Sequence, residues 1–136
     1  MSLEQFIEEN EVDKTTNLVD ESVIAEAEVQ LQVTFGTQLK QYILKYGYLG
    51  YEYAELYGMN SNENLKSDLV EQTKYLHKYY PETKNYIAIE NQGEGDYYLV
   101  DQSDMVFEYD TDMEKMTSIG CTLFEYIVKR FESINV

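Results

Sequence analysis

Three short runs rich in β-branched and aromatic residues follow one another at residues 86–90, 96–101 and 105–109. The connectors between them contain only five and three residues, whereas a crossover between parallel strands needs a dozen or more. The runs are therefore predicted to form an antiparallel meander. A further strand is expected near residues 51–57, where tyrosines alternate with other side chains.

Helical periodicity and capping residues predict helices on both sides of these strands. The expected helices cover residues 1–10, about 20–33, about 39–46, a segment from a cap at Ser67 or Asp68 to Tyr80, and about 118–131. Residues 1–19 then form an N-terminal helix and connector, and residues 59–68 a loop. The expected fold is a single α+β domain over residues 1–136, in which an antiparallel sheet packs against several helices.

The stretch NQGEGDYYLVD, at residues 91–101, could be a phosphate-binding loop or a turn. A dinucleotide fingerprint lacks its third glycine, because Tyr98 stands there, and a Walker loop lacks its lysine, because Asp96 follows Gly95. Glu94 also places a negative charge where a phosphate would bind. Gly93 and Gly95 are therefore predicted to supply positive φ in a hairpin turn, and no cofactor is expected.

Other possible reactive or metal-binding residues are sparse. His77 is the only histidine, and its position suits packing or a helix end. Cys121 is the only cysteine, and burial as a small apolar side chain is favoured over a reactive thiol. The DTDME run from Asp110 begins like a calcium loop but lacks the sixth-position glycine and the twelfth-position glutamate. No catalytic residue and no metal site are predicted.

Acidic residues give the chain a formal net charge of −16. Residues 1–35 and 90–114 together carry eighteen of the 26 acids and one base. Such a field repels nucleic acid and anionic lipid and attracts basic proteins. The alternative is that the acidity serves only solubility. The chain has no run of eighteen apolar residues, and its acidic start lacks the basic, apolar pattern of a secretory signal, so the cytoplasm is the expected compartment.

A protein partner is the expected ligand, and acids and tyrosines are the expected contacts. The chain has 14 tyrosines and no tryptophan, and tyrosine is enriched at protein interfaces, although a core role is expected for many of the rings. An exposed tyrosine surface fits a homodimer as well as a heterologous partner, so monomer and homodimer both stay open. The candidate partner-binding residues are Tyr51, Glu52, Tyr53, Glu55, Glu90, Glu94, Asp96, Asp101, Asp104, Asp110 and Asp112.

The order of these features resembles the SUKH superfamily, over about residues 20–132. The resemblance rests on the helical series Ile24, Glu28, Leu31, Phe35, Leu39, Tyr42, Ile43, Tyr46 and Gly47, on ELYG at 55–58, on GEGDYYLVD at 93–101, and on FEYI at 124–127. One departure is Phe35–Gly36, where the family usually has an aromatic–proline step, and a looser junction before the next helix is expected there.

The resemblance implies a binding module without agreed catalytic residues. SUKH proteins include bacterial immunity proteins, which neutralise toxins of their own strain, and fungal regulators of cell-wall glucan synthesis. An immunity protein against a basic, nuclease-type toxin is the first expectation, because an acidic inhibitor associates quickly with a basic cleft. A regulatory interaction domain is the alternative, and an acidic hydrolase is the third reading.

Overall fold

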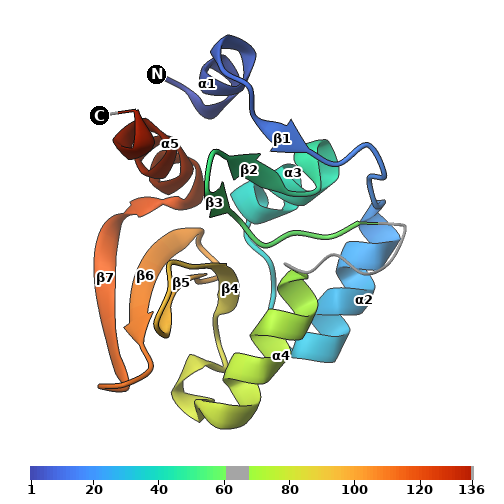
Figure 1. The fold of residues 1–136 in the computed structure, drawn as a ribbon. Coiled ribbons are helices and arrows are strands. Elements are labelled where there is room, and N and C mark those ends of the chain that lie inside the picture. Colours follow the sequence, from blue (N-terminus) through green and yellow to red (C-terminus); the bar gives the residue numbers. More distant parts are fainter. Residues whose placement is uncertain (61–67, 136) are drawn as a thin grey trace.

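The computed structural model describes residues 1–60 and 68–135 of the chain (Figure 1). Helices in this part are α1 (Leu3–Glu9), α2 (Glu21–Leu31), α3 (Thr37–Tyr46), α4 (Leu69–Tyr79), the short 3-10 helix η1 (Pro81–Thr83) and α5 (Leu123–Ile134). The strands are β1 (Asp13–Lys14), β2 (Leu49–Tyr51), β3 (Ala54–Glu55), β4 (Ile87–Asn91), β5 (Asp96–Val100), β6 (Met105–Asp110) and β7 (Lys115–Thr122).

Two antiparallel sheets organise the described residues. The larger sheet has the order β4-β5-β6-β7, and the smaller one has the order β1-β2-β3. The α+β class and the antiparallel meander are confirmed. The strand expected near residues 51–57 is two short strands, β2 and β3, which belong to the smaller sheet and not to the meander.

The segment before the last helix differs from its prediction. A helix was expected from about residue 118, but β7 extends to Thr122 and pairs with β6. The helix begins one residue later, because Thr122 and Glu125 form a capping box in which the Thr122 N–H donates to Glu125 Oε1 at 2.9 Å. Pairing with β6 therefore outweighs the helical spacing of Ile119.

Side-chain caps fix the starts of α2 and α4 as predicted. The carboxylate of Asp20 accepts the backbone N–H groups of Ser22 and Val23, and that of Asp68 accepts those of Val70 and Glu71. Ser67, the other predicted cap, lies outside the described residues, as does most of the loop expected at 59–68.

The start of α3 is capped by a residue distant in sequence. Gly36 has no side chain to offer, and the carboxylate of Asp104 instead accepts the N–H groups of Gln38 and Leu39 at 2.9 and 3.0 Å. A Cβ at Gly36 would lie only 2.3 Å from Asp104 Oδ1, so glycine is what allows this approach. The Phe35–Gly36 junction was expected to be loose, but it is held by these two hydrogen bonds.

Polar groups outside the sheet close the outer edge of β4. The Tyr57 N–H donates to the Ile89 carbonyl at 2.7 Å, and the Ala88 N–H donates to Thr73 Oγ1 at 3.0 Å. His77 Nε2 lies 2.8 Å from the Tyr86 carbonyl oxygen, as suits a residue near the end of α4. This edge of the larger sheet is therefore covered by α4 and by the segment after β3 (Figure 1).

The first and last helices, α1 and α5, lie side by side (Figure 1). The rings of Phe6, Tyr51 and Phe131 pack together with centroid separations of 5.2–5.7 Å, which joins α1 and β2 to α5. The Tyr51 hydroxyl also donates to Asn135 Oδ1 at 2.6 Å. Within the described residues, no helix combines the length and the apolar character needed to cross a bilayer.

Candidate functional site

The glycine-rich stretch is the turn between β4 and β5. Gly93 and Gly95 have φ values of +106° and +79°, which confirms the predicted positive φ. The N–H and the hydroxyl of Thr111 both donate to the Gly95 carbonyl at 3.1 Å. Since Thr111 belongs to the turn between β6 and β7, this contact holds two hairpin turns together at one end of the sheet.

Carboxylates from two neighbouring strands meet close to these turns. Asp96 on β5 lies directly opposite Asp110 on β6, and Tyr98 lies opposite Glu108. Residues two apart on a strand share a face, so all four side chains project from the same side of the sheet. We call Asp96, Glu108 and Asp110 the acidic face. Glu94 and Asp112 are exposed in the adjoining turns and extend its negative charge.

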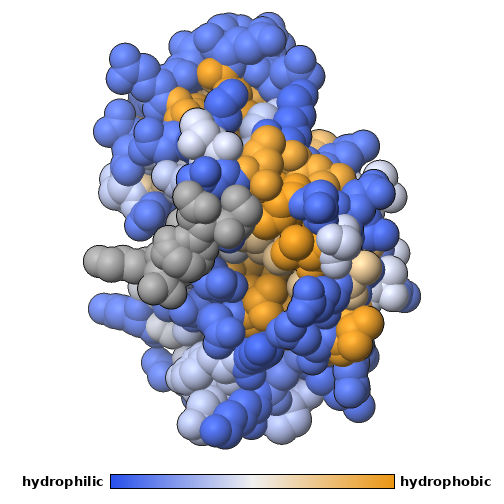
Figure 2. Space-filling view, turned by 90° about the vertical axis from the view of Figure 1, so that its right-hand side faces the viewer, coloured by the Kyte–Doolittle hydropathy of each residue, from blue (hydrophilic) through white to orange (hydrophobic). Residues whose placement is uncertain are grey.

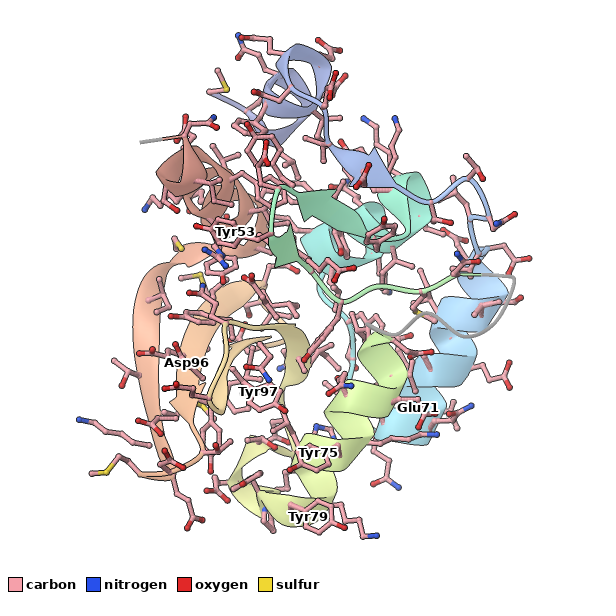
Figure 3. All side chains as sticks on the ribbon, in the orientation of Figure 1. Tyr53, Glu71, Tyr75, Tyr79, Asp96 and Tyr97 are labelled. Atoms are coloured by element: carbon pink, nitrogen blue, oxygen red, sulfur yellow. The ribbon has the colours of Figure 1, made fainter. Side chains whose placement is uncertain are left out.

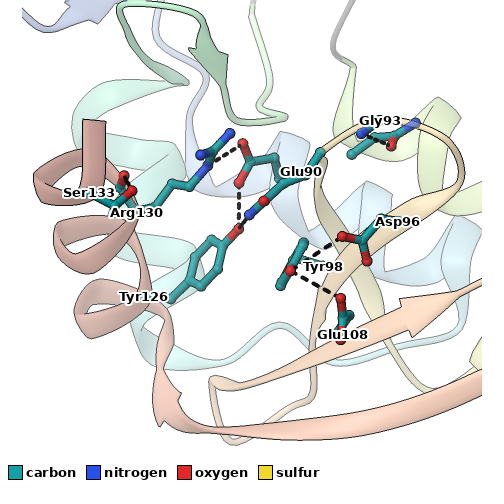
Figure 4. Close-up of polar contacts among 10 residues, drawn as sticks. Glu90, Gly93, Asp96, Tyr98, Glu108, Tyr126, Arg130 and Ser133 are labelled. Carbon is teal, nitrogen blue, oxygen red and sulfur yellow. Dashed lines mark hydrogen bonds and ion pairs between the residues drawn. The ribbon is translucent and has the colours of Figure 1, made fainter. Parts of the chain in front are cut away.

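The acidic face brings three carboxylates together, and no basic side chain of the described residues forms an ion pair with them. The Tyr98 hydroxyl lies 3.4 Å from Asp96 Oδ2 and 3.2 Å from Glu108 Oε2, and it can donate to one of them at a time (Figure 4). Burial, followed by the nearby Glu108 carboxylate, raises the pKa of Asp96 to about 6. Like charges opposed across strands are destabilising, so a cation bound here would relieve repulsion.

A second polar cluster ties β4 to α5. Glu90 is only 1% exposed, and its carboxylate accepts the Tyr126 hydroxyl at 2.5 Å and Arg130 Nε at 3.0 Å (Figure 4). Gln92 Nε2 donates to the Tyr126 oxygen at 2.9 Å. Burial, then the Glu90 charge, raises the pKa of Tyr126, so this hydroxyl stays protonated as a donor. Glu90 is thus satisfied inside the protein by a charged and a neutral donor.

A hollow of about 440 Å³ opens beside this cluster. Its walls include Tyr53 and Glu55 from the β2–β3 hairpin, Gln72 from α4, and Arg130. The guanidinium carbon of Arg130 lies 5.7 Å from the centre of the Tyr53 ring, a cation–π distance. Tyr53 is 75% exposed and lies between α5 and the β2–β3 hairpin, apart from Asp96 (Figure 3).

The structure divides the predicted partner-binding residues into separate groups. One group lies at the end of the larger sheet that carries the β4–β5 and β6–β7 turns: Glu94, Asp96, Asp110 and Asp112. Another group lies on the β2–β3 hairpin: Glu52, Tyr53 and Glu55. Asp101 accepts the N–H groups of Ser103 and Met105 and so shapes the β5–β6 turn. Three of the predicted contact residues are buried and have structural partners: Tyr51, for which a core role was the stated alternative, and the acids Glu90 and Asp104.

The sequence prediction omitted two surface features. Glu108 completes the acidic face, and alternation along residues 105–110 could have placed it on the same side as Asp110. Tyr75 and Tyr79 are 45% and 58% exposed on α4, with ring centres 5.1 Å apart (Figure 3). Their i,i+4 spacing, outside the apolar face of that helix, was the available signal.

Apolar side chains also reach the surface around α2, on the side shown in Figure 2. Val29 is 77% exposed there, and Ala25, Val33 and Leu44 line shallow hollows beside it. Val29 and Ala25 are one helical turn apart, so α2 carries apolar residues on its outer face as well as on its buried one.

The residues weighed as catalysts have packing roles. Cys121 is buried, and burial raises the pKa of its thiol, which is opposite to the activation of a reactive cysteine. Within residues 1–60 and 68–135, no three His, Cys, Asp or Glu side chains are grouped so that they could hold a metal ion. Binding of a metal or cofactor was not expected from the sequence, and that expectation stays a prediction.

A family model described as SMI1-KNR4 cell-wall (SUKH_5) matches residues 1–132. The chain belongs to this SUKH family. The match confirms the resemblance and extends it to the N-terminal helix and connector, which had been placed outside it. Membership supports a place among the immunity and regulatory protein-interaction modules of the superfamily, which is generally non-catalytic.

A solved crystal structure of a protein from Pseudomonas syringae pv. tomato has a similar fold, with a TM-score of 0.60. The two chains are 24% identical, and the alignment covers 78% of this chain and 79% of that one. At this identity the likeness concerns the fold alone. A comparison with curated proteins found no match.

Proposed function

We propose that this SUKH-family protein is an immunity protein, which neutralises a cognate basic toxin of the nuclease type by direct binding in the cytoplasm. It performs no catalysis and binds neither nucleic acid nor membrane. The observation that carries the proposal is the acidic face, where Asp96, Glu108 and Asp110 lie together without an ion-pair partner among the described residues. A lysine or arginine of a toxin would neutralise these carboxylates and release their mutual repulsion.

The charge of the whole chain supports the same kind of partner. A net charge of −16 accelerates encounter with a basic surface, and the acidic face with Glu94 and Asp112 gives the field a fixed position on a sheet and its turns. Nuclease toxins must bind phosphate and tend to be basic at the site that an inhibitor has to cover.

Stopped-flow association with the cognate toxin tests the proposal. A variant with Glu94→Gln, Asp96→Asn, Glu108→Gln and Asp110→Asn removes four charges from the proposed contact. Its matched control carries Glu8→Gln, Glu9→Gln, Glu11→Gln and Glu21→Gln, which removes four exposed charges near the N-terminus. The first variant should associate about tenfold more slowly than the control at low salt, with a weaker salt dependence. Equal rates for the two variants would refute the acidic face as the contact, and failure to inhibit the toxin would refute the immunity function.

The family description favours one alternative, a protein-interaction domain of a cell-wall regulator. In that case the protein binds a regulatory partner and protects against no toxin. Identification of the protein that co-purifies with this chain, followed by an assay of that protein for toxicity, separates the two functions.

A further inference from the structure

The two edges of the larger sheet differ in how their backbone groups are satisfied. On the outer edge of β4, the Ile89 carbonyl accepts the Tyr57 N–H and the Ala88 N–H donates to Thr73 Oγ1, while His77 contacts the Tyr86 carbonyl just before the strand. No described element lies beyond β7, the strand at the opposite edge (Figure 1). Alternate residues of an edge strand direct both backbone groups outward, so β7 offers donors and acceptors to another chain.

Beyond its first residue, β7 has few of the features that block pairing at a sheet edge. Its sequence is KMTSIGCT, which contains no proline and one charge, at Lys115. The register with β6 is irregular near Gly120, whose φ is +81°, and this distorts only the end near α5. Residues 115–118 pair regularly with β6, and Ile119 beside them is 40% exposed. A regular, mostly uncharged, exposed edge is a template for strand addition.

The acidic face specifies which kind of strand would fit this edge. Thr117 on β7 lies opposite Glu108, and Lys115 lies opposite Asp110, so both project from the side that carries the acidic face. A residue added opposite Thr117 would stand two strand spacings, about 10 Å, from Glu108. Thr117 is short, so a lysine or arginine at that added position can reach across it to the Glu108 carboxylate.

We propose that the outer edge of β7 receives an extended segment of the basic protein partner, with a lysine or arginine opposite Thr117. Backbone hydrogen bonds to β7 supply the affinity for such an added strand, and contact with the acidic face supplies specificity for a basic sequence. This inference rests on the proposed binding function and assigns it a docking mode.

A synthetic eight-residue peptide that alternates lysine with valine is the probe. Two control peptides have the same sequence and charge, but one is N-methylated at every lysine and the other at every valine. The parent peptide should bind the intact protein saturably. One of the two methylated peptides should bind at least tenfold more weakly, because its pairing edge has lost its donors. Absence of saturable binding, or equal binding of all three peptides, overturns the inference.

A matched pair of protein variants tests the position. Thr117→Lys places a positive charge between the added strand and Glu108, whereas Thr16→Lys makes the same change at an exposed residue outside the larger sheet. The first should weaken binding of the parent peptide about tenfold, and the second less than twofold. Hydrogen exchange should show new protection of amides within residues 115–120 when the peptide is bound. Equal affinities of the two variants, or unchanged exchange, also overturn the inference.

The inference and the proposed function can fail separately. Peptide pairing with β7 by a protein that inhibits no toxin would leave the edge site intact and remove the immunity function. Toxin neutralisation by the Thr117→Lys variant at full affinity, with no protection of β7 in the complex, would leave the immunity function intact and remove the edge site.

Discussion

Glu90 Oε2 lies 3.0 Å from Nε of Arg130, and this ion pair joins β4 to α5 inside the protein. Arg130→Met should lower the free energy of unfolding by about 3 kcal/mol, because it leaves a buried carboxylate without its countercharge. This is the lower end of the range for a broken buried pair, since the Arg130 side chain is 15% exposed. Urea unfolding at neutral pH measures the change.

Two further variants isolate the ion pair from other effects. Lys129→Met removes an exposed positive charge from the same helix and should change the free energy of unfolding by less than about 0.5 kcal/mol. Adding Glu90→Gln to Arg130→Met should recover more than half of the loss. No recovery in the double variant would show that Arg130 stabilises the protein through packing alone.

Asp104 should behave as a helix cap. Asp104→Ala deprives the N–H groups of Gln38 and Leu39 of their acceptor and should cost about 2 kcal/mol, the upper end for loss of a cap, because the site is buried. Asp104→Asn keeps one acceptor oxygen and should fall between the parent and the alanine variant. Asp112→Ala, at an exposed turn residue, is the control for loss of charge. The cap interpretation fails if both alanine variants unfold at the same urea concentration.

Gly95 should tolerate no side chain. Gly95→Ala introduces a Cβ at a φ of +79° and only 2.1 Å from Thr111 Oγ1, so strain adds to a clash. We expect a loss of more than about 1 kcal/mol of stability, since the left-handed region alone costs that much. Gly50→Ala is the control, because its new Cβ would meet neighbours at 3.4 Å or more without positive φ. The thermal midpoints of both variants measure the difference, and equal midpoints would contradict the turn assignment.

The parts of the fold that could be predicted from sequence depend on neighbouring residues. Connector lengths determined the antiparallel sense of β4, β5 and β6. Asp20 and Asp68 were recognised as caps because their carboxylates accept backbone N–H groups only two and three residues later. The extent of β7 could not be derived in this way, because its backbone partners lie on β6 and its side chains also fit a helical pattern.

The candidate site shows the same limit. Asp104 caps a helix that begins more than sixty residues earlier, and Glu90 is neutralised by Arg130 forty residues later. Their acidity suggested a partner surface, whereas their burial assigns them to the interior. Conversely, Glu108 joins Asp96 only through the register of β5 and β6, which no count of acids reveals.

Asp96 should make stability depend on pH in a direction opposite to that of an ion-paired carboxylate. The folded protein raises the pKa of this group from 3.8 to about 6, so in the interval between these values the native state holds a proton that the unfolded chain releases. The free energy of unfolding therefore falls as the pH rises through the interval, because ionised Asp96 is less favourable in the folded protein than in the unfolded chain. Above about pH 6 this penalty of ionisation is constant. Asp96→Asn cannot ionise and lacks this penalty.

The expected result is a stability difference between Asp96→Asn and the parent that is near zero at about pH 4 and favours the variant at about pH 7. Solvent screens a partly exposed carboxylate, so the sign and the pH interval are the test, not the size. Asp112→Asn removes the same charge from an exposed turn and controls for relief of the general negative field. Glu108→Gln removes the carboxylate that, after burial, contributes most to the raised pKa of Asp96, and it should move the transition to lower pH. Parallel pH profiles for the parent and Asp96→Asn would mean that Asp96 ionises as in the unfolded chain, and the acidic face would then hold no repulsion for a bound cation to release.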